Sequence, residues 1–367
     1  MKKTVAVLSN HHAWTYNLRL EIIEKLLEED YRVVLIVGYG KKIDDLIKLG
    51  CDFIDVPFDR HGKNPLKEIN LLCIYYKILK KLCPDVVLSY TIKPNLYGAV
   101  VCRLLKIPII SNITGLGTAV EYPGIMRTVL LTVYRFAFKK SRLVYFQNEA
   151  NRDLFLKEKI VKDNYDLLPG SGVNVNKFKC IEYPSSKNIE FIFISRVMKE
   201  KGADEYINAA IEIKKTYPQV KFHICGFCEQ AYEQQLQSLH NEGIIIYHGM
   251  VDNVLEYLKV THCTVLPTYY PEGMSNVLLE SCASGRPIIT TDRPGCGEIV
   301  DDGVNGFVVK AKDAKDLVSK MTAFIKLPYE RKKEMGLEAR SKVEKQFNRS
   351  IVVGKYLEAI NRICRRL

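Results

Sequence analysis

The chain has 367 residues and a formal net charge of +12, with 47% hydrophobic residues and 14 prolines. This length and apolar content predict two folded domains and exclude a disordered protein. The eleven cysteines lack the spacing of a disulfide framework, and the apolar run after Lys3 is too short for a secretory signal, so we expect a reducing, cytoplasmic compartment. No apolar run reaches the ~18 residues of a membrane-spanning helix. The positive charge fits nucleic acid, an anionic membrane or a phosphorylated substrate as partner, and it also fits a merely basic composition.

Strand and helix patterns alternate through the first half of the chain. We expect strands at 4–9, 31–38, 51–58, 85–90, 107–113 and 142–148, with helices up to residue 27 and at 41–49, 65–82, 95–105 and 122–140. This alternation predicts a parallel sheet with helices on both faces, which binds ligands at the carboxyl ends of its strands. Polar loops at three of these ends form one rim. Its candidate ligand-binding residues are Asn10, His12, Lys93, Asn95, Thr114 and Gly115.

A second alternating series follows a stretch rich in glycine, proline and serine. Its strands are expected at 189–195, 219–226, 244–250, 263–267 and from 287, with helices at 202–216, 229–241 and near 252–259. We therefore predict an N-terminal domain at 1–167, a connection at 168–187 and a second domain at 188–347, with a last helix at 348–367 that packs back on the first domain. The predicted fold class is α/β, with two Rossmann-like, doubly wound domains.

The stretch PEGMSNVLLESCASG, residues 271–285, has the pattern of a loop that opens a helix after a buried strand. The unpaired amides and partial positive charge of a helix N-terminus suit a phosphate group. Glu272 precedes this terminus and Glu280 lies eight residues further on, so two carboxylates flank the anion-binding backbone. A sugar nucleotide carries both phosphates and hydroxyls. Taken alone, such a stretch is more often an ordinary α/β crossover with a solvated Glu272.

Two cations follow the first strand of the second domain, in SRVMKEKGADE. Arg196 can fork onto phosphate oxygens and Lys201 can add a point charge, and both belong to the same rim as residues 268–276. The sequence contains neither the dinucleotide motif G-x-G-x-x-G nor a phosphate-binding P-loop. The pair Cys225 and Cys228 has no partner at zinc spacing, and we interpret it as structural. We therefore expect no metal and no cofactor, with side-chain cations balancing the charge of a phosphate.

The motifs SRVMKEKG and PEGMSNVLLE, with residues 284–309, resemble those of the family 4 glycosyltransferases. The resemblance implies the GT-B fold, in which two Rossmann-like domains face each other across a cleft. It also implies a retaining, metal-independent transfer of a hexosyl group from a nucleoside diphosphate sugar to a hydroxyl. By position, Arg196 and Lys201 would stabilise the leaving diphosphate, and Glu272 would contact the hydroxyls of the donor sugar. The donor-binding residues that it implies are Gly273, Met274, Ser275, Asn276 and Glu280.

The first half resembles one subgroup of this family, through the segments SYTIKPNLYG, NITGLG, FQNEANRDLF and LPGSGVNVNKF. That subgroup extends lipid-linked oligosaccharides and the repeats of capsules and O-antigens. The resemblance therefore implies a saccharide acceptor linked to polyprenyl diphosphate, and a UDP-linked hexosyl or N-acetylhexosaminyl donor. The chain departs from the pattern at Asn10-His11-His12, where many relatives have a Gly-Gly pair.

Two stretches, 65–82 and 122–143, are basic and rich in apolar residues. The second carries Arg127, Arg135, Lys139 and Lys140 and contains no acid. Basic amphipathic helices of this kind lie on anionic lipid, where each basic residue contributes about 1 kcal/mol. Both stretches also fit helices that simply cover the sheet with their apolar faces. With the implied lipid acceptor, we expect peripheral attachment to the inner face of the cytoplasmic membrane.

The leading hypothesis is thus a transferase that builds a lipid-linked surface glycan. One alternative is a GT-B sugar-nucleotide 2-epimerase, which would need no lipid acceptor. A second alternative is a non-enzymatic RNA-binding or scaffold protein that uses the positive charge. The sequence has no basic–aromatic platform of the kind that RNA-binding modules carry, so we expect no nucleic-acid partner.

Overall fold

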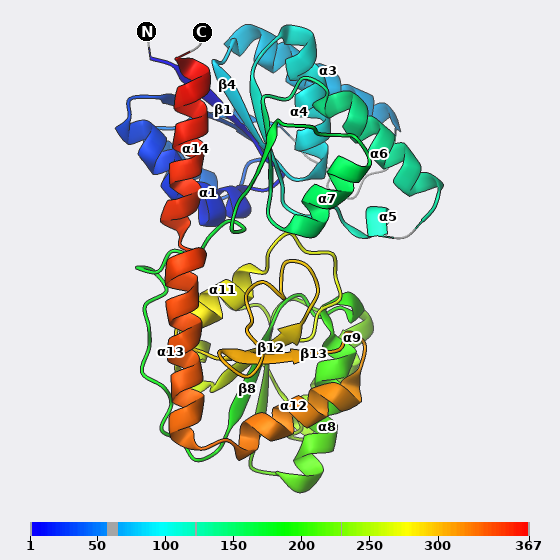
Figure 1. Ribbon diagram of the computed structural model, residues 1–367, viewed down its shortest axis with the longest axis vertical. Helices are drawn as coiled ribbons and strands as arrows, with labels where there is room; N and C mark the ends of the chain where they lie inside the picture. Colours follow the sequence, from blue (N-terminus) through cyan, green and yellow to red (C-terminus); the bar gives the residue numbers. More distant parts are fainter. Residues whose placement is uncertain (1, 57–64, 122, 229, 366–367) are drawn as a thin grey trace. The chain divides into compact units, whose positions relative to one another are not determined.

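The computed structural model describes residues 2–56, 65–121, 123–228 and 230–365. The chain divides into two compact units, Met1–Ser171 with Arg349–Leu367 and Gly172–Asn348. Four of the predicted elements extend into residues outside the described ranges, namely the strand at 51–58 and the helices at 122–140, 229–241 and 348–367. Each unit is built around its own parallel sheet (Figure 1).

The sheet of the first unit has the strand order β3-β2-β1-β4-β5-β6-β7 among the described residues. Its strands are β1 (Thr4–Leu8), β2 (Arg32–Val37), β3 (Asp52–Asp55), β4 (Val86–Tyr90), β5 (Ile109–Ile113), β6 (Leu143–Phe146) and β7 (Tyr165–Leu167). Every neighbouring pair is parallel. The chain winds outward in both directions from β1 and β4, which confirms the doubly wound topology predicted from the alternation.

Helices cover both faces of this sheet (Figure 1). One face carries α1 (His12–Glu28), α2 (Lys42–Lys48) and the final helix α14 (Arg349–Cys364), and the other carries α3 (Pro65–Leu82), α4 (Ile92–Leu105), α5 (Thr118–Glu121), α6 (Ile125–Phe138) and α7 (Glu149–Lys157). Successive residues of β1 serve the two faces in turn, because Val5 and Val7 belong to the core under α1 and α14 whereas Ala6 and Leu8 belong to the opposite core.

The final helix is an integral part of the first unit. Tyr356 of α14 is fully buried against Tyr90 and Tyr145, and its hydroxyl accepts a hydrogen bond from the Asn112 amide (2.9 Å). The Tyr145 hydroxyl donates in turn to the carbonyl of Lys355 (2.8 Å). Polar bonds and ring contacts thus fix the register of α14 on the sheet.

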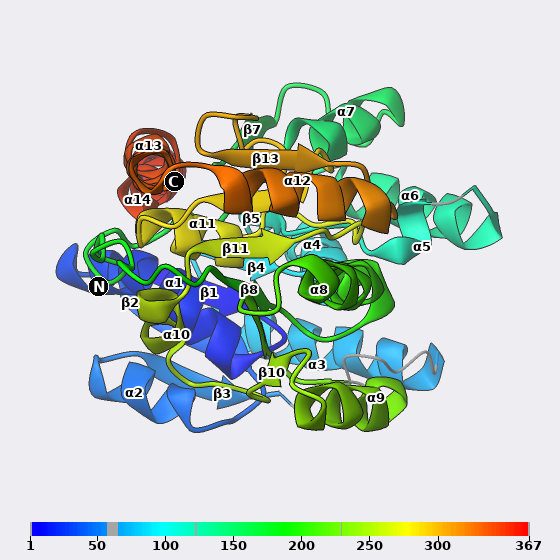
Figure 2. The ribbon, with the colours of Figure 1, turned by 90° about the horizontal axis from the view of Figure 1, so that it is seen from below.

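The sheet of the second unit has the order β10-β9-β8-β11-β12-β13 among the described residues. Its strands are β8 (Glu190–Ile194), β9 (Lys221–Cys225), β10 (Ile246–Tyr247), β11 (Cys263–Leu266), β12 (Ile288–Thr291) and β13 (Gly306–Val309), and its helices are α8 (Ala203–Thr216), α9 (Gln230–Asn241), α10 (Val254–Val260), α11 (Asn276–Ala283), α12 (Ala314–Lys326) and α13 (Tyr329–Gln346). Helix α8 packs beside α12, and α11 packs beside α13 (Figures 1 and 2). The topological switch lies between β8 and β11.

Two arginines, Arg286 and Arg340, hold residues 172–187, most of the predicted connection, onto the second unit. Arg286 is fully buried and donates to the carbonyls of Leu258 (2.7 Å), Ile181 (3.1 Å) and Glu182 (2.9 Å). Arg340 of α13 donates to the carbonyl of Phe178 (2.6 Å). The backbone of this irregular segment therefore finds its partners in guanidinium groups instead of in a sheet.

We expect Arg286→Met to lower the free energy of unfolding by about 3 kcal/mol or more, because several buried carbonyls lose their donor. Arg286→Lys keeps the charge without the planar fork and should give an intermediate loss. Urea denaturation measures both. The exposed Lys345 of α13 provides the control, since Lys345→Met should change stability by about 0.5 kcal/mol at most. A loss below about 1 kcal/mol for Arg286→Met would contradict the clamp.

Candidate functional site

Loops from two neighbouring strands meet at the carboxyl edge of the second sheet. Strand β8 pairs with β11 in parallel, with Phe191 opposite Cys263 and Ile192 opposite Thr264. Residues 195–202 leave the edge after β8, and residues 267–275 leave it after β11. This edge at a topological switch is where open α/β sheets bind ligands.

The turn after β8 is fixed to the turn after β11. A short 3-10 helix, Lys199–Lys201, ends at Gly202, whose φ of 81° lies in the left-handed region that favours glycine. A Cβ atom on Gly202 would lie 2.4 Å from the carbonyl oxygen of Pro267, so a larger residue has no room. The amide of Tyr269 donates to the carbonyl of Glu200 (2.9 Å), and so does the hydroxyl of Thr268 (3.2 Å). The backbone thus positions the side chains of both turns before any ligand arrives.

Three of the sequence-predicted residues come together here. The Lys201 ammonium group forms an ion pair with the Glu272 carboxylate, and both side chains are largely buried. The ring of Tyr270 contacts both cations, with the Lys201 Nζ atom 4.9 Å and the Arg196 guanidinium carbon 5.8 Å from its centre. Arg196 itself is exposed. One buried and one accessible cation thus lie against the same aromatic ring.

The charge of Lys201 is destabilised by its surroundings. Burial is the main cause, the Arg196 guanidinium adds repulsion, Cys296 works in the opposite direction, and the net effect lowers the pKa of Lys201 to about 8. A bound anion would favour the protonated form of this lysine. Lys201 is therefore suited to bind negative charge such as that of a diphosphate.

The loop before α11 offers less backbone to a ligand than its sequence implied. The amide of Ser275 donates to the carbonyl of Gly295 (2.8 Å), so this amide is already bonded within the protein. The Ser275 side chain makes no capping hydrogen bond, which leaves the first turn of α11 without a side-chain cap. Gly273, Met274 and Ser275 are buried, whereas Asn276 is partly exposed. Glu280 lies within α11, partly exposed, one turn beyond the helix start.

In the first unit, Asn10 and His12 lie at the switch between β1 and β4. His11 caps α1 by accepting from the amide of Ala13 (3.1 Å), and His12 is the first residue of that helix. The imidazole of His12 packs on Gly40, where a Cβ atom would approach it to 2.2 Å. Within the described part of the chain, Asn10 Oδ1 and His12 Nδ1 are buried and have no hydrogen-bond partner. Both positions therefore hold buried polar atoms without a partner next to the rim, and their role in binding a ligand stays a prediction.

Lys93 and Asn95 have partners within the first unit. The Lys93 ammonium group pairs with Glu68 at 2.6 Å. Asn95 is 1% exposed, and its side chain accepts from the Ser89 hydroxyl (2.8 Å) and donates to the carbonyl of Asn112 (2.8 Å). We therefore assign Asn95 to the packing of α4 against the ends of β4 and β5. It is not placed to contact a substrate.

Thr114 and Gly115 follow β5 and are partly exposed. The structure adds Thr91, which no sequence pattern singles out. Its φ of 70° and ψ of 165° place a β-branched residue in a region that is almost confined to glycine. Its hydroxyl oxygen is buried and has no hydrogen-bond partner among the described residues. Backbone strain and an unsatisfied hydroxyl thus coincide at the carboxyl end of β4, beside Asn10.

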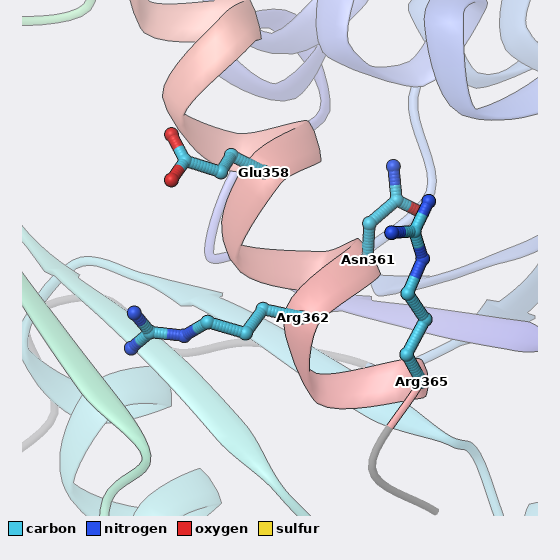
Figure 3. A pocket seen from close by; sticks show the side chains of 4 residues that line it. All are labelled: Glu358, Asn361, Arg362 and Arg365. Atoms are coloured by element: carbon cyan, nitrogen blue, oxygen red, sulfur yellow. The ribbon is translucent and has the colours of Figure 1, made fainter.

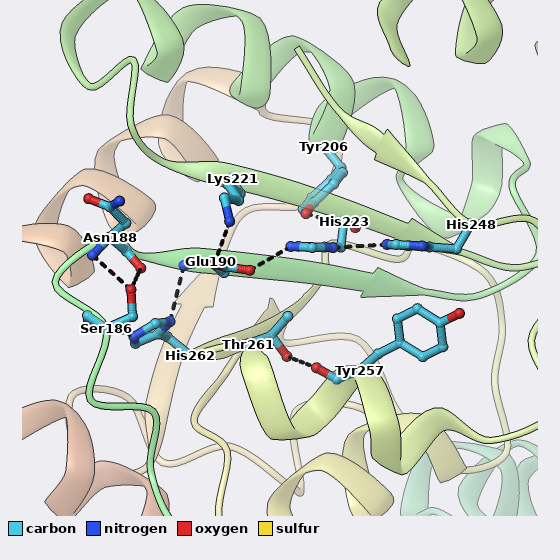
Figure 4. A network of polar contacts seen from close by, with 10 residues as sticks. All are labelled: Ser186, Asn188, Glu190, Tyr206, Lys221, His223, His248, Tyr257, Thr261 and His262. Carbon is cyan, nitrogen blue, oxygen red and sulfur yellow. Dashed lines mark hydrogen bonds and ion pairs between the residues drawn. The ribbon is translucent and has the colours of Figure 1, made fainter. Parts of the chain in front are cut away.

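A second polar cluster in the second unit is structural. Glu190 accepts from His223 (2.9 Å) and Lys221 (3.0 Å), and His223 contacts His248 (2.9 Å), in a row across the sheet (Figure 4). Burial works to raise the pKa of Glu190, but these two partners outweigh it and hold the pKa below its ordinary value. Glu190 begins β8, so its carboxylate lies at the edge opposite to Arg196. Among the described residues, no three His, Cys, Asp or Glu side chains are grouped to hold a metal ion.

Comparison with known proteins identifies the chain. Residues 177–342 match the family model described as glycosyl transferases group 1, and residues 4–148 match the model described as glycosyl transferase 4-like. The chain belongs to the family 4 glycosyltransferases. It is 26% identical over 381 residues to the N,N'-diacetylbacillosaminyl-diphospho-undecaprenol alpha-1,3-N-acetylgalactosaminyltransferase of Campylobacter jejuni, with 99% of this chain and 100% of that protein covered. It is 24% identical to the UDP-Gal:alpha-D-GlcNAc-diphosphoundecaprenol alpha-1,3-galactosyltransferase of Escherichia coli, with 82% and 81% covered.

Solved structures of glycosyltransferases share the fold. The structure of Anabaena HepE in complex with UDP and glucose matches with a TM-score of 0.80 at 16% identity, covering 98% of this chain and 100% of that one. A glycosyltransferase from Rickettsia africae matches with a TM-score of 0.80 at 18% identity, covering 99% and 98%. The fold class predicted for this glycosyltransferase, GT-B with two Rossmann-like domains, is confirmed.

Proposed function

We propose that this glycosyltransferase moves a hexosyl or N-acetylhexosaminyl group from a UDP-sugar to a hydroxyl of a saccharide linked to polyprenyl diphosphate. The names of the Campylobacter jejuni and Escherichia coli relatives include a diphospho-undecaprenol acceptor, and the second also includes UDP-Gal. The observation that carries the proposal is the convergence of Lys201, Glu272 and Tyr270, with Arg196 beside them, at the switch edge of the second sheet.

Each proposed role follows from the chemistry of the transfer. The bond between the anomeric carbon and the diphosphate oxygen breaks, and negative charge builds on that oxygen. Arg196 and Lys201 stabilise this charge more strongly in the transition state than in the ground state, which lowers the barrier. The acceptor oxygen forms the new bond on the same face, and its proton passes to the leaving phosphate oxygen. Retention of configuration and independence of a metal are parts of this proposal.

Glu272 has two tasks in this scheme. Its ion pair holds the Lys201 ammonium group at the site, and its remaining lone pairs can accept from hydroxyls of the donor sugar. We propose that Asn276 and the uncapped first turn of α11 bind the phosphates, and that Glu280, one turn further along the helix, binds the ribose. The Met274 side chain is buried in the hydrophobic core of the second unit. The bonded Ser275 amide takes no part.

We also propose that the first unit rests on an anionic membrane through α6. Five apolar side chains of α6 are between 37% and 86% exposed, namely Ile125, Met126, Val129, Val133 and Phe136. Their spacing places them on one side of the helix, where Phe136 also contacts the Arg103 guanidinium of α4, 4.5 Å from its ring centre. In the described part of the chain, no helix is long and apolar enough to cross a bilayer. An exposed apolar stripe of this kind fits a helix that lies in the membrane interface.

The basic residues of α6 divide into two groups. Arg127 and Arg135 are placed against Glu158, at 3.9 Å and 3.4 Å, and Arg135 also donates to the Glu158 carbonyl. They hold α6 onto the end of α7, so the sequence-based assignment of both to membrane contact is not retained. Lys139 and Lys140 follow the helix and are exposed, and these two remain the proposed lipid contacts.

Incubation with radiolabelled UDP- and GDP-sugars, with and without a polyprenyl-diphosphate saccharide, tests the function. We expect label to reach the lipid from a UDP-sugar. Arg196→Ala and Lys201→Ala should each lower kcat about 10- to 100-fold, because one charge-assisted contact to the leaving group is lost. Lys199→Ala, an exposed lysine of the same turn, is the matched control and should stay within about twofold.

If the protein formed an epimer of the donor sugar and transferred no sugar to the lipid, its function would be that of an epimerase. If both alanine variants kept turnover within about twofold, the catalytic assignment of the two cations would be wrong.

The affinity for UDP should fall about tenfold between about pH 7 and about pH 9, because the Lys201 charge that favours the diphosphate is lost as pH rises through its pKa of about 8. Calorimetric titration with UDP at several pH values measures this. Lys201→Arg stays charged throughout and should show a flat profile. Ionisation of UDP affects both proteins equally, so it cancels in the ratio of their affinities. An equally steep profile for Lys201→Arg would exclude Lys201 as the titrating group.

Val129→Ser with Phe136→Ser should weaken binding to phosphatidylglycerol vesicles about tenfold or more, because two apolar side chains leave the interface. Flotation at low salt measures this binding. The control is Leu337→Ser, an exposed apolar residue on α13 of the second unit, which should have no effect. Failure of the wild-type protein to float, or an equal loss in the control, would refute attachment through α6.

A further inference from the structure

A basic pocket of about 670 Å³ lies in the first unit, away from the candidate catalytic rim. Seven of its twelve lining residues are lysine or arginine, and one, Asp163, is an acid. Arg142 directly precedes β6, and its amide donates to the carbonyl of Ile109 at the start of β5 (3.0 Å). The pocket therefore opens at the amino edge of the sheet, whereas Thr91 and Thr114 follow the carboxyl ends of its strands.

The cations of this pocket have few partners inside the protein. Arg135 is held by Glu158. Among the described residues, the side chains of the other six make no hydrogen bond or ion pair, and they are Lys139, Lys140, Arg142, Lys159, Lys162 and Arg362. Arg362 extends from α14 on the side opposite to Asn361 and Arg365 (Figure 3), and it reaches the pocket from there. Uncompensated positive charge from three separate segments thus gathers around one cavity.

The floor of the pocket is polar and incomplete. Ser141 is only 7% exposed, and its hydroxyl oxygen has no hydrogen-bond partner in the described part of the chain. Its carbonyl accepts from the Asn164 amide (2.9 Å), which ties the two lining segments together. Phe138 and Ile160 are buried and form an apolar wall. A buried hydroxyl without a partner costs free energy unless a ligand completes its bonding.

Helix C-termini account for only part of this basicity. Helices α6, α7 and α14 all end near the pocket, and cations in a last turn offset the partial negative charge there. Lys162 lies five residues beyond the end of α7, outside that range. Lys159 adopts the left-handed conformation, with φ of 54°, at a position where glycine would be less strained. Lys159 does cap the end of α7, since its amide donates to the carbonyl of Leu156 (3.0 Å), whereas Lys162 and the Ser141 hydroxyl serve no helix terminus.

We propose that this pocket binds the phosphate group of an anionic phospholipid headgroup. The Ser141 hydroxyl donates to a phosphate oxygen, while Arg142 and Lys162 balance its charge. Continuity with the exposed apolar stripe favours a lipid over a free phosphate, because Lys139 and Lys140 line the pocket and directly follow α6, which carries that stripe. The inference rests on the proposed membrane attachment of α6 and is independent of the proposed catalytic roles.

Flotation of the full chain with three variants tests the proposal, using phosphatidylcholine vesicles with and without phosphatidylglycerol. Ser141→Ala changes no charge and should weaken binding to the anionic vesicles about fivefold, with an unchanged or higher melting temperature. Arg142→Gln with Lys162→Gln should weaken it about tenfold or more. The matched control is Lys41→Gln with Lys48→Gln, two exposed lysines next to and within α2 that remove the same charge, and it should stay within about twofold.

Inorganic phosphate should compete with the vesicles for the wild-type protein and not for Ser141→Ala. If Ser141→Ala bound the vesicles as tightly as the wild-type protein, or if the Lys41 and Lys48 control lost as much binding, the protein would respond only to charge in general. Either result would refute the proposed headgroup pocket. If the protein bound inorganic phosphate and did not bind anionic vesicles, the proposal that the ligand is a lipid headgroup would be wrong. Transfer to a short-chain acceptor in detergent should be normal in every variant, so failure of the pocket is separated from failure of the transferase assignment.

Discussion

The parallel pairing of β8 with β11 determines where the second unit can carry out chemistry. The chain winds away from this pair in both directions, so the connections that leave the carboxyl ends of these two strands run to opposite sides. The loops that follow them meet directly, and the carbonyl of Glu200 accepts from both Thr268 and Tyr269. The ion pair between Lys201 and Glu272 is a consequence of this backbone contact. A different strand order with the same residues would separate the pair.

Most of the fold could be predicted because buried strands and amphipathic helices leave clear patterns. Strands such as β1 and β4 are buried at every position and read as continuous apolar runs. Strands β7 and β13 were missed because each is short and half-buried. The segment 172–187 looks like a linker in sequence, since it lacks periodicity. Sequence gives no signal that Arg286 and Arg340, more than a hundred residues later, bond its carbonyls.

The candidate site was predictable where a motif fixes backbone and side chain together, as for Arg196, Lys201 and Glu272. It was not predictable where the direction of a side chain decides whether the residue faces the site. Tyr270 lies within the segment TYYP, residues 268–271, and only the structure shows its ring against both cations. Asn95 is the reverse case, because this polar residue of α4, expected at the rim, turns inward and bonds Ser89 and Asn112. Spacing in a sequence sets which loop a residue occupies and leaves open which way it points.

Hydrogen-bond satisfaction separates the structural cation Arg286 from Lys201, one of the two cations of the second unit that we propose to act on a ligand. Arg286 is fully buried, and carbonyl oxygens surround its guanidinium group, so nothing remains for a ligand. Lys201 forms an ion pair with the Glu272 carboxylate, and burial lowers its pKa to about 8. Fold stability gains little from such a lysine. Its burial becomes favourable once a diphosphate supplies the missing negative charge. Because the folded protein already holds this cation in place, it can stabilise the charge that develops on the leaving phosphate.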